Sequence, residues 1–136
     1  MKRVAAPVLL VAAIAAASPS LAVTPEGGRP VRGIAPGDEN CDVTVVFGSY
    51  AMGIDSESYA KVERYLKRRP KVKFKATNWG REGERTICIN AKTDAAARRI
   101  YADLEAMAPA TANRGPITIR SRFGDSFQSK PPATMR

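Results

Sequence analysis

One short turn concentrates the side chains that could do chemistry. The segment Asn78 to Glu84 (NWGREGE) places Trp79, the only tryptophan, beside Arg81, Glu82 and Glu84. An exposed tryptophan among charges can bind a glycan or a partner protein, because aromatic and arginine side chains dominate contact energies. The alternative is a tryptophan folded back over a sheet edge, with ordinary solvated charges around it. Trp79 and Arg81 are therefore candidate binding residues.

The same turn contains two glutamates that could act as the paired carboxyl groups of a glycoside hydrolase. Glycoside hydrolases use carboxyl groups about 5 to 9.5 Å apart, one of them in apolar surroundings that raise its pKa. Glu82 and Glu84 lie on an open turn that lacks such surroundings. Ser49 is a candidate nucleophile, but the chain has no histidine to activate it. We therefore expect no enzymatic activity, and a small hydrolase is the less favoured alternative.

The composition excludes further classes of site. The 136 residues contain no histidine and two cysteines, which rules out imidazole zinc sites and Cys₄ clusters. The loop Gly48 to Gly53 (GSYAMG) lacks the Lys-Ser/Thr ending of a P-loop and the G-x-G-x-x-G spacing. We interpret that loop as a tight connection between a strand and a helix. We expect no metal and no cofactor.

Positive charge is the strongest compositional feature. Lysine and arginine number 22 against 13 acids, a formal charge of +9, and between Lys61 and Lys75 the sole acid is Glu63. Lys71, Lys73 and Lys75 alternate along a predicted strand and form a candidate surface for acidic cell-wall polymers or lipid headgroups. Two structural roles compete with that interpretation: cations stabilise a helix C-terminus, and lysines protect an edge strand from aggregation.

Nucleic acid is not an expected partner. RNA-binding sheets place aromatic residues on the exposed face, where bases stack on them. The corresponding positions here are taken by residues without aromatic rings, namely Thr44, Val46, Thr86 and Cys88.

The first 22 residues have the pattern of a secretory signal peptide. Lys2 and Arg3 precede an uncharged apolar run, and small residues at Ser20 and Ala22 fit a cleavage site after Ala22. The apolar run is shorter than the roughly 20 residues that a spanning helix needs. We expect a periplasmic or secreted protein without a transmembrane segment in the mature chain.

Hydrophobic periodicity predicts one domain over residues 41–122, between a flexible Pro/Gly-rich leader (23–40) and a disordered tail (123–136). Apolar residues alternate in predicted strands and recur every three or four residues in predicted helices. The predicted elements are a strand at 43–47, a helix from Asp55 to near Arg69, strands at 71–76 and 86–90, a helix from Thr93 or Asp94 to Met107, and a strand around 117–119. This βαββαβ order predicts an α+β ferredoxin-like sandwich, with a four-stranded antiparallel sheet and two helices on one face.

Cys41 and Cys88 form the obvious disulfide in an oxidising compartment. The alternatives are a reactive thiol or pairing between molecules. The predicted strands raise one objection to this bridge. Side chains alternate between the two faces of a strand, so Cys41 would point to the same face as the core-facing Val43, whereas Cys88 would point to the face opposite the core-facing Ile87. A direct bridge therefore requires Cys41 to lie outside the regular strand.

The stretch Val43 to Asn78 (VTVVFGSYAMGIDSESYAKVERYLKRRPKVKFKATN) resembles the opening β-α-β of OmpA-like peptidoglycan-binding domains. In that family an aspartate after the second strand and an arginine of the next helix bind the diaminopimelate group. The resemblance places Asn78 at the aspartate position and Arg98 or Arg99 at the arginine position. An amide cannot supply the charge-assisted bond of a carboxylate. The resemblance implies shared topology and, as an alternative function, peptidoglycan binding.

These observations favour a small exported protein with a non-enzymatic binding or structural role in the cell envelope. The expected partners are an anionic envelope component, either peptidoglycan or lipid headgroups, or a partner protein. The residues expected to bind them are Trp79, Arg81, Lys71, Lys73 and Lys75.

Overall fold

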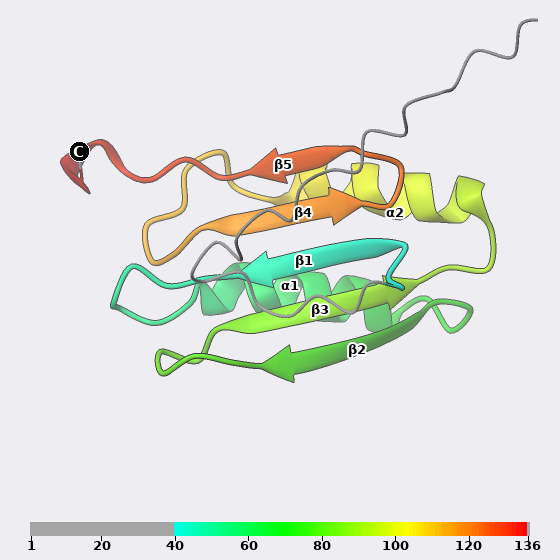
Figure 1. Ribbon diagram of the computed structural model, residues 1–136, viewed down its shortest axis with the longest axis horizontal. Helices are drawn as coiled ribbons and strands as arrows, with labels where there is room; N and C mark the ends of the chain where they lie inside the picture. Colours follow the sequence, from blue (N-terminus) through cyan, green and yellow to red (C-terminus); the bar gives the residue numbers. More distant parts are fainter. Residues whose placement is uncertain (1–39, 136) are drawn as a thin grey trace, which may run out of the picture. The chain divides into compact units, whose positions relative to one another are not determined.

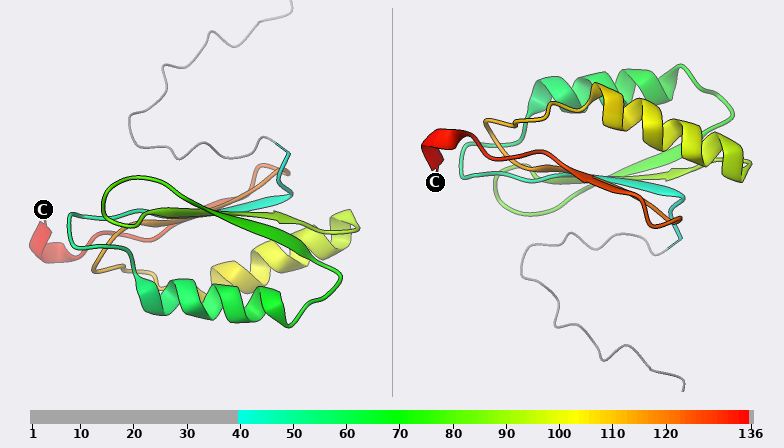
Figure 2. Two further views of the ribbon diagram at one scale, coloured as in Figure 1. Left: turned by 90° about the horizontal axis from the view of Figure 1, so that it is seen from below. Right: turned by 90° about the horizontal axis from the view of Figure 1, so that it is seen from above.

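A five-stranded antiparallel sheet, covered on one face by two helices, forms the fold (Figures 1 and 2). The computed structural model describes residues 40–135. The predicted signal peptide, its cleavage site after Ala22 and the predicted leader up to residue 39 lie outside the described residues. The α+β class is therefore confirmed for the part of the chain that the structure describes.

The elements follow the predicted order, with one strand added. They are β1 (Val43–Phe47), α1 (Ser56–Lys67), β2 (Lys73–Asn78), β3 (Arg85–Asn90), α2 (Asp94–Met107), β4 (Ile117–Ser121), β5 (Ser126–Gln128) and a 3₁₀ turn, η1 (Ala133–Met135). The strand order is β2-β3-β1-β4-β5, which puts β1 in the middle and the lysine-rich β2 at an edge.

The fifth strand corrects two predictions. The sheet has five strands rather than four, and the predicted disordered tail at 123–136 contains β5, which pairs with β4. A tight turn makes this pairing possible: Gly124 adopts a left-handed φ of 97°, and the Ser121 hydroxyl accepts hydrogen bonds from the backbone N–H groups of Phe123 and Asp125. β5 therefore covers an edge of β4 that would otherwise be left without backbone partners.

Each helix begins at a side-chain cap and buries one apolar stripe against the sheet. The Asp55 carboxylate accepts the N–H of Ser58 at 3.0 Å, and the Thr93 hydroxyl accepts the N–H of Ala96 at 3.2 Å. Thr93, one of the two predicted caps, is thus the cap of α2. The stripes meet the apolar face of the sheet in one core, whose fully enclosed members include Phe47, Leu66, Ile87, Ile89, Leu104, Ile117 and Ile119.

The predicted disulfide between Cys41 and Cys88 is confirmed, and the parity objection is resolved as expected. Cys41 lies before β1, so the chain can turn back over the helix-free face of the sheet, where Cys88 points. Asp42 fixes this turn: its carboxylate accepts the N–H of Ala91 at 2.7 Å and pairs with Arg122 Nε at 3.0 Å. The Cα atoms of the two cysteines lie 5.3 Å apart.

Candidate functional site

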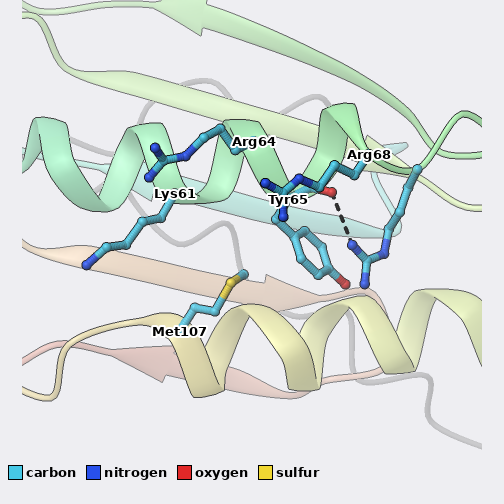
Figure 3. A pocket seen from close by; sticks show the side chains of 6 residues that line it. Lys61, Arg64, Tyr65, Arg68 and Met107 are labelled. Atoms are coloured by element: carbon cyan, nitrogen blue, oxygen red, sulfur yellow. Dashed lines mark hydrogen bonds between the residues drawn. The ribbon is translucent and has the colours of Figure 1, made fainter.

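A groove of about 370 Å³ lies between α1 and the end of α2 (Figure 3). Tyr65 and Met107 extend into the space between the helices, and Lys61, Arg64 and Arg68 project from α1. Arg69, which follows the helix, completes the lining. Four of the six residues that form the groove are thus cationic.

Helical spacing explains why these cations gather. Positions three, four and seven apart share one face of an α-helix, so Lys61, Arg64 and Arg68 form a row along α1. The Asp55 cap sets where the helix begins, and Pro70 prevents it from continuing. Cations near the last turn also interact favourably with the negative end of the helix dipole.

The cations of the groove differ in their acidic partners. Lys61 pairs with Glu57 one turn earlier at 2.8 Å, and Arg69 pairs with Asp103 of α2 at 3.3 Å. Within residues 40–135, Arg64 and Arg68 have no such partner. Their positive charge is available to a ligand, and both side chains are solvent-accessible.

Tyr65 anchors the floor of the groove. Its hydroxyl donates to Asp103 Oδ2 at 2.7 Å, and the Arg69 guanidinium lies 3.5 Å from the centre of its ring. Arg69 also donates to the Tyr65 carbonyl at 3.1 Å. Burial, followed by the hydrogen bond to Asp103, raises the pKa of Tyr65 far above its usual value.

The raised pKa predicts a loss of stability at alkaline pH. Below about pH 10 the Tyr65 hydroxyl is protonated in both the folded and the unfolded chain, so its full contribution is present. Above that pH the unfolded chain ionises first, and the contribution declines as the pH rises toward the folded-state pKa. We expect the difference in urea midpoint between the wild type and Tyr65→Phe to be constant from about pH 7 to 9 and to shrink above about pH 10. Parallel pH profiles of the two proteins would contradict this role.

The three lysines predicted as a binding surface, Lys71, Lys73 and Lys75, do not line the groove. Lys73 and Lys75 belong to β2 and pair with Asn90 and Cys88 of β3. Because paired side chains point to the same face of a sheet, both lysines lie on the helix-free face. Lys71 lies in the connection between α1 and β2. We name the basic residues from position 61 to 75 the basic edge; they are Lys61, Arg64, Lys67, Arg68, Arg69, Lys71, Lys73 and Lys75.

Trp79 and Arg81 do not join the basic edge. They follow the far end of β2, whereas α1 connects to its beginning. The Trp79 indole N–H donates to Thr86 Oγ1 at 3.0 Å, which folds the ring back toward the helix-free face of the sheet. Arg81 is exposed at the turn. The structure therefore places Trp79 on the same helix-free face as Lys73 and Lys75 but at the other end of β2, and the cations of the groove lie on the opposite, helix-covered face.

The candidate catalytic residues Ser49 and Glu84 form hydrogen bonds with backbone N–H groups of their own turns. The Ser49 hydroxyl accepts the N–H groups of Ala51 and Met52, at 3.0 and 3.2 Å. The Glu84 carboxylate accepts the N–H of Glu82 at 2.9 Å and closes the β2–β3 turn. Both side chains thus stabilise turns. Arg64 and Arg68 are not among the residues predicted to bind, although their spacing from Lys61 on a predicted helix was a signal that could have identified them.

The two positions implied by the OmpA-like resemblance lie toward opposite ends of the sheet. Asn78 pairs with Arg85, where β3 begins. Arg98 stacks on Phe123, which follows the end of β4, and β4 ends at the same end of the sheet as β3. No protein-family model, curated protein or solved structure matches the chain. Neither helix within residues 40–135 is long and apolar enough to cross a membrane.

Proposed function

We propose that this protein is an exported, non-enzymatic module that binds an anionic surface of the cell envelope through its basic edge. The observation that carries the proposal is the row of cations on α1, in which Arg64 and Arg68 line a groove without an acidic partner in the described part of the chain. A shallow, strongly cationic groove suits an extended polyanion, which gains contact from several positive side chains at once.

The charge distribution supports a surface rather than a small pocket as the binding element. The basic edge continues from the α1 row through Lys71 to the lysines of β2, so cations face two sides of one border of the domain. Helix-dipole and edge-strand effects account for part of this pattern. They do not require unpaired arginines along the groove, and those arginines are what the proposal explains.

Export is part of the proposal and rests on two features. The sequence of residues 1–22 has the signal-peptide pattern, and the Cys41–Cys88 disulfide is of a kind that persists in oxidising compartments. We further propose that the sheet and helices form a ferredoxin-like sandwich extended by β5. The order β2-β3-β1-β4 and the placement of both helices on one face support this.

Co-sedimentation tests the proposal with two kinds of anionic surface, purified peptidoglycan sacculi and phospholipid vesicles with anionic headgroups. Each cation near an anionic membrane contributes about 1 kcal/mol, so the double variant Arg64→Gln/Arg68→Gln is expected to bind such vesicles about 30-fold more weakly. Binding of the wild type is expected to weaken with salt. The surface that retains the protein identifies the partner.

A matched control separates local from overall charge. Arg120→Gln/Lys130→Gln removes the same two charges from exposed positions on β4 and after β5, toward the opposite edge of the sheet from β2, and is expected to bind almost as well as the wild type. Lys73→Gln/Lys75→Gln measures the contribution of β2. Equal losses in the Arg64/Arg68 and Arg120/Lys130 variants would show that only net charge matters and would refute a specific basic edge.

A further inference from the structure

A second pocket, of about 310 Å³, lies at the other end of α1 from the basic edge. It is formed where the loop before α1, the β2–β3 turn and the loop before β4 meet. The residues that matter for its chemistry are Ile54, Tyr59, Glu82, Arg85 and Arg114. Two arginines and one carboxylate give this pocket a net positive charge.

Arg85 is an unusual residue for its position in the sheet. It is the first residue of β3 and shares the parity of Ile87 and Ile89, which belong to the core. Its side chain therefore points to the face covered by helices. There the guanidinium carbon lies 4.6 Å from the centre of the Tyr59 ring.

The guanidinium of Arg85 is incompletely satisfied. Its Nε is buried and has no hydrogen-bond partner among the described residues, and no carboxylate in residues 40–135 pairs with the group. Burying a charged donor without an acceptor destabilises the folded state. Stacking on Tyr59 offsets only part of this loss. A bound anion on the pocket side would supply the missing negative charge.

Arg114 provides a second positive group on the same pocket. It is exposed and is held in place by a hydrogen bond from Nη1 to the Met52 carbonyl, at 3.4 Å. The backbone on either side of it is also fixed, because the Tyr50 N–H donates to the Arg114 carbonyl at 2.8 Å. The two arginines thus line one pocket from separate, ordered segments.

We propose that this pocket binds a small organic carboxylate between the guanidinium groups of Arg85 and Arg114. The planar guanidinium matches the two oxygens of a carboxylate. The ring of Tyr59 and the side chain of Ile54 supply apolar contact for the carbon part of the ligand. Glu82 at the same pocket disfavours a dianion such as phosphate. This site is separate from the basic edge and does not depend on the function proposed above.

Thermal unfolding of the full chain tests the proposal, with acetate, N-acetylalanine and inorganic phosphate as probes at constant ionic strength. A ligand that binds only the folded state raises Tm, and at concentrations well above Kd the shift is several degrees for a domain of this size. We expect N-acetylalanine to give the largest rise in the wild type, acetate a smaller one, and phosphate none beyond that of chloride.

The variants separate a ligand site from a structural arginine. Arg85→Met keeps an unbranched side chain that fills part of the same space and removes the unsatisfied charge, so it is expected to melt at or above the wild-type Tm and to show no carboxylate shift. Arg114→Met changes an exposed residue and is expected to reduce the shift, whereas Arg81→Met is expected to retain it. In wild-type ¹H–¹⁵N spectra, N-acetylalanine should move the Arg85 Nε–H signal. An equal Tm rise in Arg85→Met, no rise with any carboxylate, or a rise with phosphate alone would overturn the proposal.

Discussion

Replacing Cys41 and Cys88 together by alanine is expected to lower the free energy of unfolding by about 4 kcal/mol. The disulfide closes a loop over a sequence separation of 47 residues, and the chain-entropy relation gives this value for a loop of that length. The loss arises mainly because the unfolded chain gains freedom. A small domain has a stability of about 5 to 15 kcal/mol, so the variant is expected to remain folded but to unfold at much lower denaturant concentration. Urea unfolding followed by circular dichroism measures the change.

The bridge is expected to be dispensable for the arrangement of the sheet itself. Asp42 still joins three segments in the absence of the disulfide, through the N–H of Ala91, the Arg122 guanidinium and the backbone of Ile89. Wild-type protein unfolded in the presence of a reductant should therefore match the double variant. A double variant with wild-type stability would show that the bridge does not constrain the unfolded state. A double variant whose near-UV circular dichroism shows no fixed tertiary packing at 25 °C would show that Asp42 cannot hold the turn.

The sequence predicted most elements because local patterns and tertiary contacts agree there. β1 alternates apolar and polar residues and ends at Gly48, so its bounds could be derived from the pattern alone. β5 was missed because it has three residues, of which only Phe127 packs against the core. Its pairing depends on the free edge of β4 and on the Ser121–Asp125 turn, and a window of sequence contains neither the edge nor the register.

The candidate sites could be predicted only in part, because they depend on contacts between elements. The sequence locates the excess of cations at 61–75, but the groove needs Met107 and Asp103 from α2, and their distance from Tyr65 is a tertiary property. The direction of Trp79 depends on a hydrogen bond across the β2–β3 turn. Arg85 was detectable in principle, since a charge at a core-parity position contradicts the strand pattern and such contradictions mark functional or strained sites.

A methyl group at Gly115 is expected to destabilise the fold by about 3 kcal/mol. Gly115 packs directly on the backbone of the loop after β1: a Cβ there would overlap the Gly48 carbonyl and lie 2.7 Å from the Cα of Ser49. Hydrogen bonds on both sides fix the two loops together, from the Gly48 N–H to the Pro116 carbonyl and from the Tyr50 N–H to the Arg114 carbonyl. The backbone therefore cannot withdraw without losing them, and overpacking of this kind costs about 1 to 3 kcal/mol or more.

Gly124→Ala is the matched control, because it places an L-residue in left-handed backbone without a steric clash and lies outside the pocket. Gly124 has a φ of 97°, and no neighbouring atom lies within 4 Å of the place that its methyl group would take. The variant therefore loses only the roughly 1 to 2 kcal/mol that left-handed backbone costs an L-residue. Gly115 does not have a left-handed φ, so the stability lost in Gly115→Ala comes from the steric overlap alone.

The two alanine variants also differ in their expected effect on the pocket. Because Gly115→Ala displaces Arg114, it is expected to weaken the carboxylate-dependent rise in Tm, whereas Gly124→Ala lowers the Tm more modestly and retains that rise. Thermal and urea unfolding of both variants, with and without N-acetylalanine, measure the difference. If both variants had the same unfolding free energy, the close contact between the Gly48 and Gly115 loops would not exist in solution, and the placement of Arg114 at the pocket would lose its support.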